Sequence, residues 1–461
     1  MNRHGSINLI SFAGPRYTAA MPATAATESF SAAQAPQALA AAPLSRRAEW
    51  AAGQPISMLM AQALANPQLI SLAAGFVDQA TLPVEEVRIA TEAVLSDPGH
   101  GRAALQYGST PGYLPLREMI LADLKSRDGH CQSERNVNVE QVVLTAGSNQ
   151  LLHLVCESLL DPGDIVLCAA PTYFVFLGTL ANLGARAVSV DTDEHGMIPE
   201  ALALRLEALA ATGQASRVKM IYLVTYSDNP AGVTMPADRR RAVVEIAQRW
   251  SQRRRLYVVA DDAYRQLTYH GDDPPSLRSF DEKGQTVIAA GTYSKSFAPG
   301  LRVGWGVLPR PLVEPVCNQK GNIDFGSPHL SQNVMAKVHE LGLYEPHVAG
   351  LRLSYRRKME TLLAAASEFF GDIAGARWIT PRGGLYVWME LPEEIDTGLD
   401  GRLFKEAVKE GVLYVPGQYC FAAEGAPVRR HMMRLSFGVQ PCERIRKGMA
   451  ALARAVTRCL E

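Results

Sequence analysis

Long apolar runs alternate with amphipathic stretches in the middle of the chain, between about residues 140 and 310. Runs such as KMIYLVTY and LYVVADDAY are apolar without interruption, which is typical of strands buried on both faces of a sheet. We predict strands near 142–145, 165–168, 186–190, 219–225, 256–260, 286–291 and 302–308. Helical periodicity is clearest at 149–160, 173–183, 199–211 and 236–250. This alternation predicts an α/β fold with a mostly parallel seven-stranded sheet covered by helices.

The pattern changes after about residue 330. A long helical pattern over 345–370 is followed by short apolar runs in ARWITPRGGLYVWMELP and HMMRLSFG, with helices predicted near 402–410 and from Pro441. These elements predict a smaller α+β domain over 331–461, beside a large domain over 91–330.

The N-terminal part divides into two stretches. Residues 1–45 are rich in Ala, Ser, Thr and Pro and are predicted to be a disordered extension. Residues 46–90 contain the helical stretch ISMLMAQALA, and we expect this segment to join the small domain.

Composition narrows the class of protein. The 461 residues are 47% hydrophobic and 20% charged, and basic and acidic residues balance at 46 each, so no global field attracts nucleic acid or an anionic membrane. Seven scattered cysteines without a CxxC pair predict reduced thiols in the cytoplasm rather than a disulfide framework or a zinc site. No apolar run reaches the roughly 18 residues of a membrane span.

The stretch GTYSKSFAPGLRVGW, from Gly291 to Trp305, holds the strongest candidate chemistry. Lys295 has apolar neighbours and a second cation, Arg302, nearby, and such surroundings favour loss of the lysine proton. A neutral lysine amine attacks a carbonyl to form a Schiff base. The hydroxyls of Thr292 and Ser294 and the fork of Arg302 suit a phosphate dianion. An aldehyde and a phosphate on one molecule indicate pyridoxal 5′-phosphate (PLP), whereas an isolated SxSK run is as often a surface loop.

Further polar residues follow the predicted strands, where ligands of parallel sheets bind. Ser148 and Asn149 open a helix after a glycine turn, which suits a phosphate, although an ordinary N-cap serine is an equal alternative. Tyr173 suits stacking on a pyridine ring, and core packing is its commoner role. Asn229 lies in an Asn-Pro turn, and its side-chain amide is able to donate a hydrogen bond to a phenolic oxygen.

Two adjacent carboxylates, Asp261 and Asp262, close the next strand. A carboxylate partner keeps a pyridine nitrogen protonated, as PLP chemistry requires. Two carboxylates also suit a metal ion, but no third ligand stands in a matching motif, so we predict no metal.

In this order, over residues 46–461, the motifs resemble those of the class I/II aminotransferases of PLP fold type I. The branch most similar is that of the 2-aminoadipate and kynurenine aminotransferases. The matching runs are S-K-x-x-x-P-G-L-R-x-G at Lys295, T-x-G-S-N-Q at Ser148, P-x-Y at Tyr173, N-P-x-G at Asn229, D-x-x-Y at Asp261 and R-L-x-F at Arg434. The resemblance implies a PLP-dependent enzyme, with Lys295 as the catalytic lysine, that moves the amino group of an α-amino acid to a 2-oxo acid such as 2-oxoglutarate.

The resemblance also implies roles for other residues. Asp261 binds the pyridine nitrogen, Tyr264 joins Asn229 at the phenolic oxygen, and Arg434 binds the substrate α-carboxylate. Gly75, in S-L-A-A-G-F, lies at the active-site mouth beside the substrate. Tyr107, in L-Q-Y-G, reaches the cofactor phosphate of the neighbouring subunit, which implies a homodimer with shared active sites. Asn149 in place of glutamine and Ala74 in place of glycine depart from the family pattern.

Two other functions stay open. A PLP-dependent lyase or cyclase uses the same fold and lysine, because fold and cofactor do not fix the reaction. A PLP-binding regulatory module would carry a basic DNA-binding domain before the fold, which residues 1–45 do not resemble in length or charge. Amino transfer that depends on a keto acid separates these functions.

The substrate is predicted to be a neutral, apolar or aromatic amino acid. No Lys or Arg occurs between Trp50 and Arg88, and the helical stretch there offers Met58, Leu59 and Met60. A distal carboxylate buried against these side chains would lack a partner. Arg265 and His329 are the alternative sources of a charge that would accept an acidic side chain.

Overall fold

The structure is a computed structural model that describes residues 44–51, 68–129 and 137–461. Residues 45–461 form one compact unit. The first 43 residues and the stretch ISMLMAQALA lie outside the described residues, so the predicted extension and the predicted apolar helix at Met58–Met60 stay predictions.

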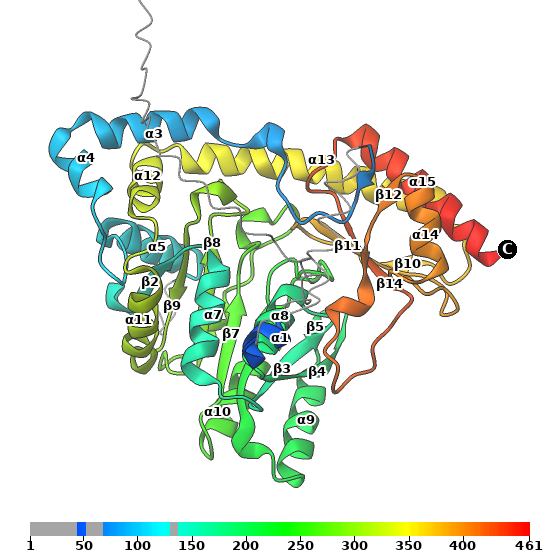
Figure 1. The fold of residues 1–461 in the computed structure, drawn as a ribbon, viewed down its shortest axis with the longest axis horizontal. Coiled ribbons are helices and arrows are strands. Elements are labelled where there is room, and N and C mark those ends of the chain that lie inside the picture. Colours follow the sequence, from blue (N-terminus) through cyan, green and yellow to red (C-terminus); the bar gives the residue numbers. More distant parts are fainter. Residues whose placement is uncertain (1–43, 52–67, 130–136) are drawn as a thin grey trace, which may run out of the picture. The chain divides into compact units, whose positions relative to one another are not determined.

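An eight-stranded sheet lies at the centre of the larger part of this unit (Figure 1). In spatial order its strands are β2 (Val142–Thr145), β9 (Gly304–Val307), β8 (Val287–Thr292), β7 (Tyr257–Asp261), β6 (Val218–Val224), β3 (Ile165–Ala170), β4 (Arg186–Asp193) and β5 (Gly196–Met197). The five strands from β8 to β4 run parallel, and β2, β9 and β5 pair antiparallel with their neighbours. The mostly parallel sheet and its seven predicted strands are confirmed.

The eighth strand, β5, is the one departure from the predicted sheet. It pairs with the end of β4 through Thr192–Met197 and Asp193–Gly196, after a turn that places Gly196 at φ +92°. Glycine adopts a positive φ without strain, which permits this tight reversal. Two residues show no periodicity, so the sequence pattern did not reveal β5.

Helices cover both faces of the sheet. The helices of this part are α3 (Val84–Ser96), α4 (Pro98–Leu105), α5 (Leu114–Arg127), α7 (Ser148–Leu159), α8 (Phe174–Asn182), α9 (Pro199–Ala211), α10 (Ala237–Ser251), α11 (Arg310–Asp324) and α12 (His329–Glu340). Of these, α3 and α4 pack against α12 at the edge of the molecule rather than on the sheet (Figure 1). The short helix α1 (Arg46–Trp50) contacts α8. Single 3₁₀ turns occur at Gln79–Thr81, Val139–Gln141, Ala215–Arg217, Arg265–Leu267, Leu277–Phe280, Pro299–Leu301 and Gly417–Cys420.

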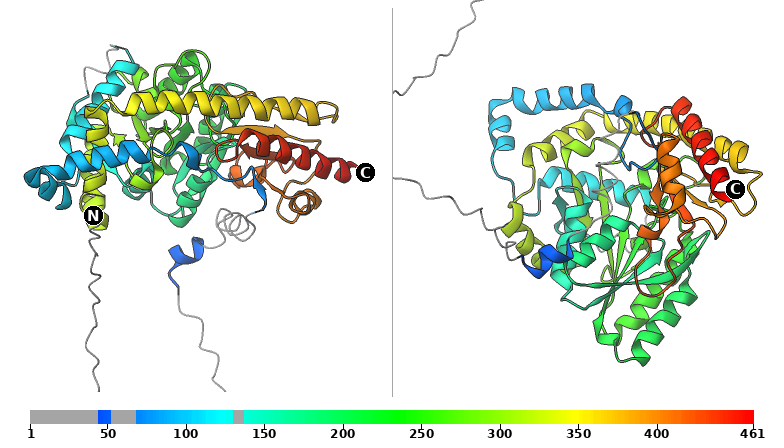
Figure 2. Two further views of the ribbon diagram at one scale, coloured as in Figure 1. Left: turned by 90° about the horizontal axis from the view of Figure 1, so that it is seen from above. Right: turned by 45° about the vertical axis from the view of Figure 1, so that its right-hand side comes forward.

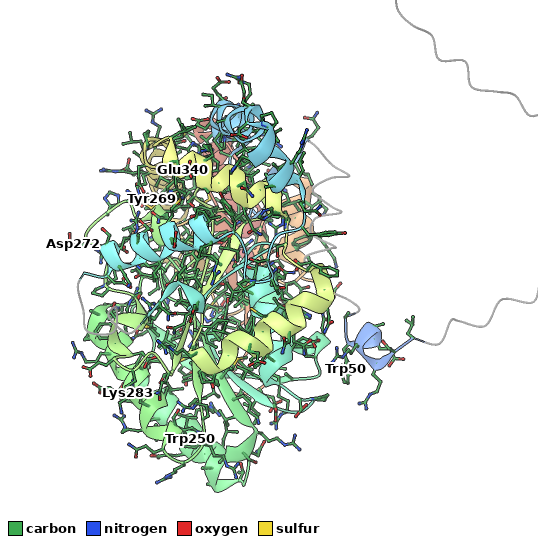
Figure 3. All side chains as sticks on the ribbon, turned by 90° about the vertical axis from the view of Figure 1, so that its left-hand side faces the viewer. Trp50, Trp250, Tyr269, Asp272, Lys283 and Glu340 are labelled. Atoms are coloured by element: carbon green, nitrogen blue, oxygen red, sulfur yellow. The ribbon has the colours of Figure 1, made fainter. Side chains whose placement is uncertain are left out.

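The core explains why the strands are apolar without interruption. Successive side chains of a strand point to opposite faces. Leu167 of β3 and Ile221 of β6 belong to a cluster with residues of α9 and α10, whereas Cys168 and Tyr222 belong to a second cluster with residues of α7 and α8. Side chains fill the space between the sheet and its helices (Figure 3). Both faces of the sheet are therefore buried, as the sequence predicts.

A four-stranded antiparallel sheet lies in the C-terminal part of the unit. Its strands, in spatial order, are β10 (Arg377–Trp378), β11 (Tyr386–Glu390), β14 (Met432–Ser436) and β13 (Val415–Pro416). The helices α13 (Tyr344–Phe370) and α15 (Cys442–Leu460) lie side by side along it, with α14 (Arg402–Lys409) next to α15 (Figure 2). The predicted α+β character of this part is confirmed.

The N-terminal segment reaches this C-terminal part. Strand β1 (Ile70–Ser71) pairs in parallel with β12 (Val412–Leu413), and the Ser436 N–H donates to the Leu72 carbonyl over 2.7 Å. This pairing supports the proposal that residues 46–90 join the small domain, and we keep boundaries near 90 and 330 as a proposal. None of the helices in the described ranges is long and apolar enough to cross a membrane.

Candidate active site

A cavity of about 160 Å³ lies where β6, β7 and β8 end. It is lined by Ser148, Asn149, Tyr173, Val224, Asn229, Asp261, Ala263, Tyr264, Thr292, Ser294, Lys295, Pro299 and Arg302. Every residue that we predict to bind the cofactor lines this cavity, except Tyr107. The parallel strands bring these residues together because their carboxyl ends meet at one edge of the sheet.

One end of the cavity is rich in hydrogen-bond donors. Helix α7 begins directly after Gly147, whose φ of +79° and whose place against Arg302 exclude a side chain: a Cβ there would come within 2.5 Å of the Arg302 Nη2. Arg302 donates to the carbonyls of Ala146 and Pro299, and the Thr292 hydroxyl donates to Ser294 Oγ over 2.9 Å. A helix N-terminus, two hydroxyls and a guanidinium form a donor set that suits a phosphate dianion.

Asp261 is a buried carboxylate at the end of β7. The Tyr222 hydroxyl donates to its Oδ2 over 3.0 Å, and the Ala263 N–H donates to its Oδ1 over 3.2 Å. Burial raises the pKa of Asp261 to about 6, although these two hydrogen bonds and the nearby Lys295 act in the opposite direction. Asp261 is therefore charged at neutral pH without an ion pair to any described residue, and it suits a protonated ring nitrogen.

Lys295 is half-buried at the turn after β8. Its Nζ donates to the carbonyl oxygen of Gly75 over 2.8 Å. A Cβ at Gly75 would lie 2.8 Å from the Tyr386 hydroxyl, so only glycine lets this segment approach both side chains. The structure thus brings the predicted mouth residue Gly75 into direct contact with Lys295.

Arg434, on β14, lies beside the cavity and is joined to it through Asn229. Its side chain is 2% exposed; Nη1 donates to Asn229 Oδ1 over 2.8 Å, and Nη2 donates to the Ala73 carbonyl over 2.7 Å. The guanidinium lies 4.3 Å from the Tyr386 ring centre and 5.4 Å from that of Phe174. Its Nε has no hydrogen-bond partner among the described residues. A buried guanidinium in this state suits a carboxylate ligand.

Tyr386 and Tyr222 complete the site, although no motif in the sequence indicated either of them. The Tyr386 and Tyr264 hydroxyls lie 3.1 Å apart, with ring centres 5.7 Å apart and planes nearly perpendicular, and Tyr222 supports Asp261 as described above. Burial raises the pKa of Tyr264 well above its usual range, so its hydroxyl stays protonated. Both missed tyrosines stand inside apolar strands, where a tyrosine ordinarily indicates core packing.

Three residues considered in the sequence do not reach the cavity. Tyr107 is 81% exposed, with its ring 5.6 Å from that of Phe325. Arg265 pairs with Asp128 over 2.6 Å and with Asp273 over 2.9 Å. Burial lowers the pKa of His329, so this residue is neutral at pH 7.

The charges of the cavity fit PLP and one further carboxylate. None of Asp261, Lys295, Arg302 and Arg434 forms an ion pair with a residue in the described part of the chain, although Asp261 and Arg434 are buried. Buried charges are ordinarily paired, because moving a charge out of water costs free energy unless an opposite charge compensates it. A ring nitrogen, an aldehyde, a phosphate and an α-carboxylate supply the complementary groups. Within the described ranges no group of three or more His, Cys, Asp or Glu is placed to hold a metal ion.

Comparison with known proteins gives a consistent result. Residues 67–450 match the model of the family "Aminotransferase class I and II". The chain is 34% identical to aromatic-amino-acid aminotransferase 1 of Thermococcus litoralis over 388 residues, which cover 84% of this chain and 88% of that protein. It is 31% identical to the 2-aminoadipate transaminase of Thermus thermophilus, over 85% of this chain and 91% of that protein.

Solved structures show the same relationship. The kynurenine aminotransferase of Pyrococcus horikoshii, in complex with pyridoxamine phosphate (PMP), superposes with a TM-score of 0.83 at 31% identity, covering 91% of this chain and 98% of that one. The family model spans most of the chain, and the fold matches that of solved aminotransferases. The chain is a PLP-dependent enzyme that belongs to the class I and II aminotransferases.

Proposed function

We propose that this aminotransferase takes its amino group from a neutral, apolar or aromatic α-amino acid and passes it to a 2-oxo acid such as 2-oxoglutarate. The observation that supports this proposal is Arg434, a buried guanidinium without an ion pair to the described residues, next to the cavity that contains Lys295. One such cation accommodates one carboxylate, the α-carboxylate that all amino acids share.

The residues around the cavity have separate roles toward the cofactor and the substrate. When bound, PLP supplies an aldehyde and a ring that withdraws electrons from the substrate Cα. Lys295 would hold the cofactor aldehyde and, once free of it, would accept the proton from the substrate Cα. Asp261 holds the ring nitrogen protonated. Tyr264 and Asn229 donate toward the phenolic oxygen.

The two ends of the ligands are held by separate groups. Thr292, Ser294, Arg302 and the N-terminus of α7 hold the phosphate, and Tyr173 covers the ring. Arg434 and Asn229, joined over 2.8 Å, would hold the α-carboxylate. Fixing both ligands in this way brings the reacting atoms together before the reaction begins.

The preference for a neutral side chain follows from where the cations lie. Lys295 and Arg302 are the cations that line the cavity, and both already have roles. Arg265 is held by two aspartates, and His329 is neutral at pH 7, so neither supplies a charge for a distal carboxylate. The aromatic rings of Tyr386 and Phe174 pack against Arg434 and favour an apolar side chain. The name of the Thermococcus litoralis relative agrees with this preference, whereas that of the Thermus thermophilus relative indicates the acidic alternative.

The first half-reaction tests the preference. We expect kcat/KM for leucine, phenylalanine and methionine to exceed that for 2-aminoadipate and glutamate by about tenfold or more, because an unpaired buried carboxylate costs at least about 1.4 kcal/mol. The conversion of bound PLP to PMP is followed by its absorbance at equal enzyme loading. A preference for the two dicarboxylates would exclude the proposed substrate class while leaving the aminotransferase activity untouched.

We also propose a homodimer in which Tyr107 contacts the cofactor phosphate of the second copy. Tyr107, Phe325, Ile323 and Leu105 are large apolar residues that are more than half exposed, at the ends of α4 and α11. Apolar residues gathered at a surface in this way favour association with another protein chain.

A mixing experiment tests the shared site. The variants Lys295→Ala and Tyr107→Ala are each expected to be impaired as homodimers. Refolded together, they form heterodimers in which one of the two sites has both residues, so that activity returns to about a quarter of the wild-type level. Sedimentation as a monomer, or no recovery on mixing, would exclude the shared site.

The cytoplasm is our proposed location. The six described cysteines are free thiols, and burial raises the pKa of Cys156, Cys168 and Cys420. Thiols in this state are typical of a reducing compartment.

A further inference from the structure

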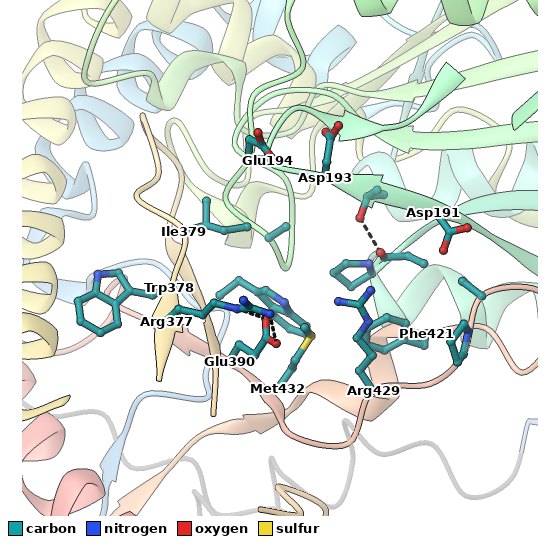
Figure 4. Close-up of a pocket in the computed structure, with 17 residues that line it drawn as sticks. Asp191, Asp193, Glu194, Arg377, Trp378, Ile379, Glu390, Phe421, Arg429 and Met432 are labelled. Atoms are coloured by element: carbon teal, nitrogen blue, oxygen red, sulfur yellow. Dashed lines mark hydrogen bonds and ion pairs between the residues drawn. The ribbon is translucent and has the colours of Figure 1, made fainter. Parts of the chain in front are cut away.

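A second cavity, of about 250 Å³, lies between the large sheet and the small sheet (Figure 4). Its walls come from the ends of β3 and β4 and the turn before β5 on one side, and from β10, β11, β14 and the segment 421–429 on the other. None of its lining residues lines the catalytic cavity. It is therefore a separate site.

The inner wall of this cavity is apolar and aromatic. Trp388, Phe421 and Met432 are buried, with the Trp388 and Phe421 ring centres 6.3 Å apart, and Ala231 and Pro171 face them from the large-sheet side. An aromatic wall of this kind binds an apolar or aromatic side chain.

Two opposite charges, Arg429 and Asp191, line the same cavity at its exposed side and have no partner among the described residues. Arg429 extends from its own segment toward the strands of the large sheet, and Asp191 stands on that opposite wall (Figure 4). Neither forms a hydrogen bond or ion pair through its side chain with a residue in the described ranges, and the same holds for Glu194, whereas Arg377 pairs with Glu390 and Asp193 with Arg239. Glu194 adds a carboxylate at the rim.

We propose that this cavity binds a free amino acid with an apolar or aromatic side chain. Arg429 pairs with its carboxylate, Asp191 pairs with its ammonium group, and its side chain lies on Trp388 and Phe421. A simple carboxylate is disfavoured by the carboxylates of Asp191 and Glu194, and a simple amine by the guanidinium of Arg429. A zwitterionic amino acid gives both Arg429 and Asp191 a partner of opposite charge.

The cavity adjoins the elements that hold the substrate. Trp388 stands opposite Arg434 in the β11–β14 pair, Ala231 follows Asn229 by two residues, and Pro171 precedes Tyr173 by two. A ligand here contacts the segments that position the catalytic site without entering it. A ligand here is therefore placed to act as an effector of the catalytic site, and the lining of the cavity contains no lysine for chemistry of its own.

Calorimetry on the borohydride-reduced holoenzyme, which cannot turn over, tests the proposal with L-phenylalanine as the probe. We expect a binding event that persists in Arg434→Ala and weakens about tenfold or more in Arg429→Gln and in Asp191→Asn, the loss typical of one charge-assisted hydrogen bond. Arg430→Gln is the matched control, because Arg430 pairs with Asp396 and does not line the cavity. 3-Phenylpropionate and 2-phenylethylamine, which each lack one charge, are expected to bind at least tenfold more weakly than phenylalanine.

Three results would overturn the proposal. The first is that Arg434→Ala binds no phenylalanine, which would leave the catalytic cavity as the only site for phenylalanine. The second is equal binding by Arg429→Gln and wild type, with the unfolding temperature unchanged. The third is binding of 3-phenylpropionate as tight as that of phenylalanine, which would show that Asp191 recognises no ammonium group.

Discussion

Asp261 and Asp262 are adjacent in the sequence and both buried, yet they face opposite surroundings. Successive residues at a strand end point to opposite sides. Asp261 faces the catalytic cavity, where it meets hydrogen-bond donors and no ion pair among the described residues. Asp262 lies instead near Arg240 and Arg265, which with Asp128, Asp262 and Asp273 we define as the arginine cluster. The Thr225 hydroxyl donates to Asp262, which forms no ion pair with a described residue, and burial raises the pKa of Asp262 to about 7 although the two arginines act in the opposite direction.

The ion pairs of the arginine cluster are those of Arg265, whereas Arg240 is held by backbone carbonyls. Arg265 pairs with both Asp128 and Asp273, and Arg240 donates to the carbonyls of Met235, Thr225 and Pro275. The two guanidinium groups flank the Tyr226 ring at 4.0 and 5.1 Å. Burial alone would raise the pKa of Asp128, but Arg265 and the donors of Ser276 outweigh it, and the pKa is lowered.

The catalytic cavity shows the opposite arrangement. Asp261, Lys295 and Arg434 are held by hydrogen bonds to neutral groups, so their charges are compensated only when ligands bind. The comparison teaches that ion pairs within the chain, such as those of Arg265, stabilise the fold, whereas unpaired charges that line or adjoin a cavity indicate where ligands of the opposite charge bind.

The largest expected effect is that of Lys295→Ala. Removing the general base is expected to lower kcat by about 10³- to 10⁴-fold, while the phosphate contacts retain PLP. In the wild type, borohydride should fix the cofactor to Lys295, as shown by peptide mapping. Cofactor found on Lys320, the buried lysine that pairs with Asp324, would contradict the assignment.

Arg434→Ala and Arg265→Ala form a matched pair of buried arginines, one from each region. Losing one partner of a buried charge pair costs about 2–5 kcal/mol, so Arg434→Ala should weaken amino-acid binding about 30- to several-thousandfold with little change in the unfolding temperature. Arg265→Ala leaves Asp128 and Asp273 without their partner, and its free energy of unfolding should fall by about 3–5 kcal/mol. Saturation curves and thermal unfolding measure the two effects; the reverse pattern would contradict the comparison.

The two aspartates provide a sharper test. Asp261→Asn is expected to lower kcat by about 10²- to 10³-fold, the usual cost of losing a preorganised electrostatic contact. Asp262→Asn should change kcat by only a few-fold, because Asp262 faces Thr225 and the arginines rather than the cavity. Equal losses of activity in the two variants would mean that the cluster takes part in catalysis.

The raised pKa of Asp261 predicts that the stability of the apoprotein depends on pH. The pKa of Asp261 rises from 3.8 in a free side chain to about 6 in the fold, so the folded state binds more protons between these values. The contribution of Asp261 to the stability of the apoprotein should therefore fall as the pH rises from about 4 to 6 and stay lower above it. Asp261→Asn, which mimics the protonated form, should unfold at a higher temperature than wild-type apoprotein at pH 8. This difference should shrink toward pH 4; a constant difference would contradict the raised pKa.

The smallest expected effect is that of Tyr386→Phe. The variant loses the hydrogen bond to Tyr264, worth about 1 kcal/mol, and kcat/KM should fall about fivefold. Tyr226→Phe, which loses a hydrogen bond to the Pro274 carbonyl, is the control from the cluster and should affect stability alone. An unchanged kcat/KM in Tyr386→Phe would make the tyrosine pair a packing contact.

The sequence by itself determined the strand and helix order of the large sheet. Strands such as β6 and β7 are apolar without interruption because both of their faces are buried, and that pattern is local. It also determined the motifs at the strand ends. The parallel strands β6, β7 and β8 bring Asn229, Asp261 and Lys295 to one edge, and β2, which runs in the same direction across the antiparallel β9, brings Ser148 there. That these residues lie in one cavity could therefore be predicted without knowledge of side-chain packing.

The tertiary structure alone decided what each charge meets. Arg434 and Asn229 are 205 residues apart, and Lys295 and Gly75 are 220 apart, so their contacts depend on how the small sheet and the N-terminal segment pack on the large sheet. The same packing brings Tyr386 to Tyr264 and ties Arg265 to Asp128. Periodicity reports which residues are buried but not which partner they meet there, because partners in a core are chosen by the packing of elements far apart in the chain.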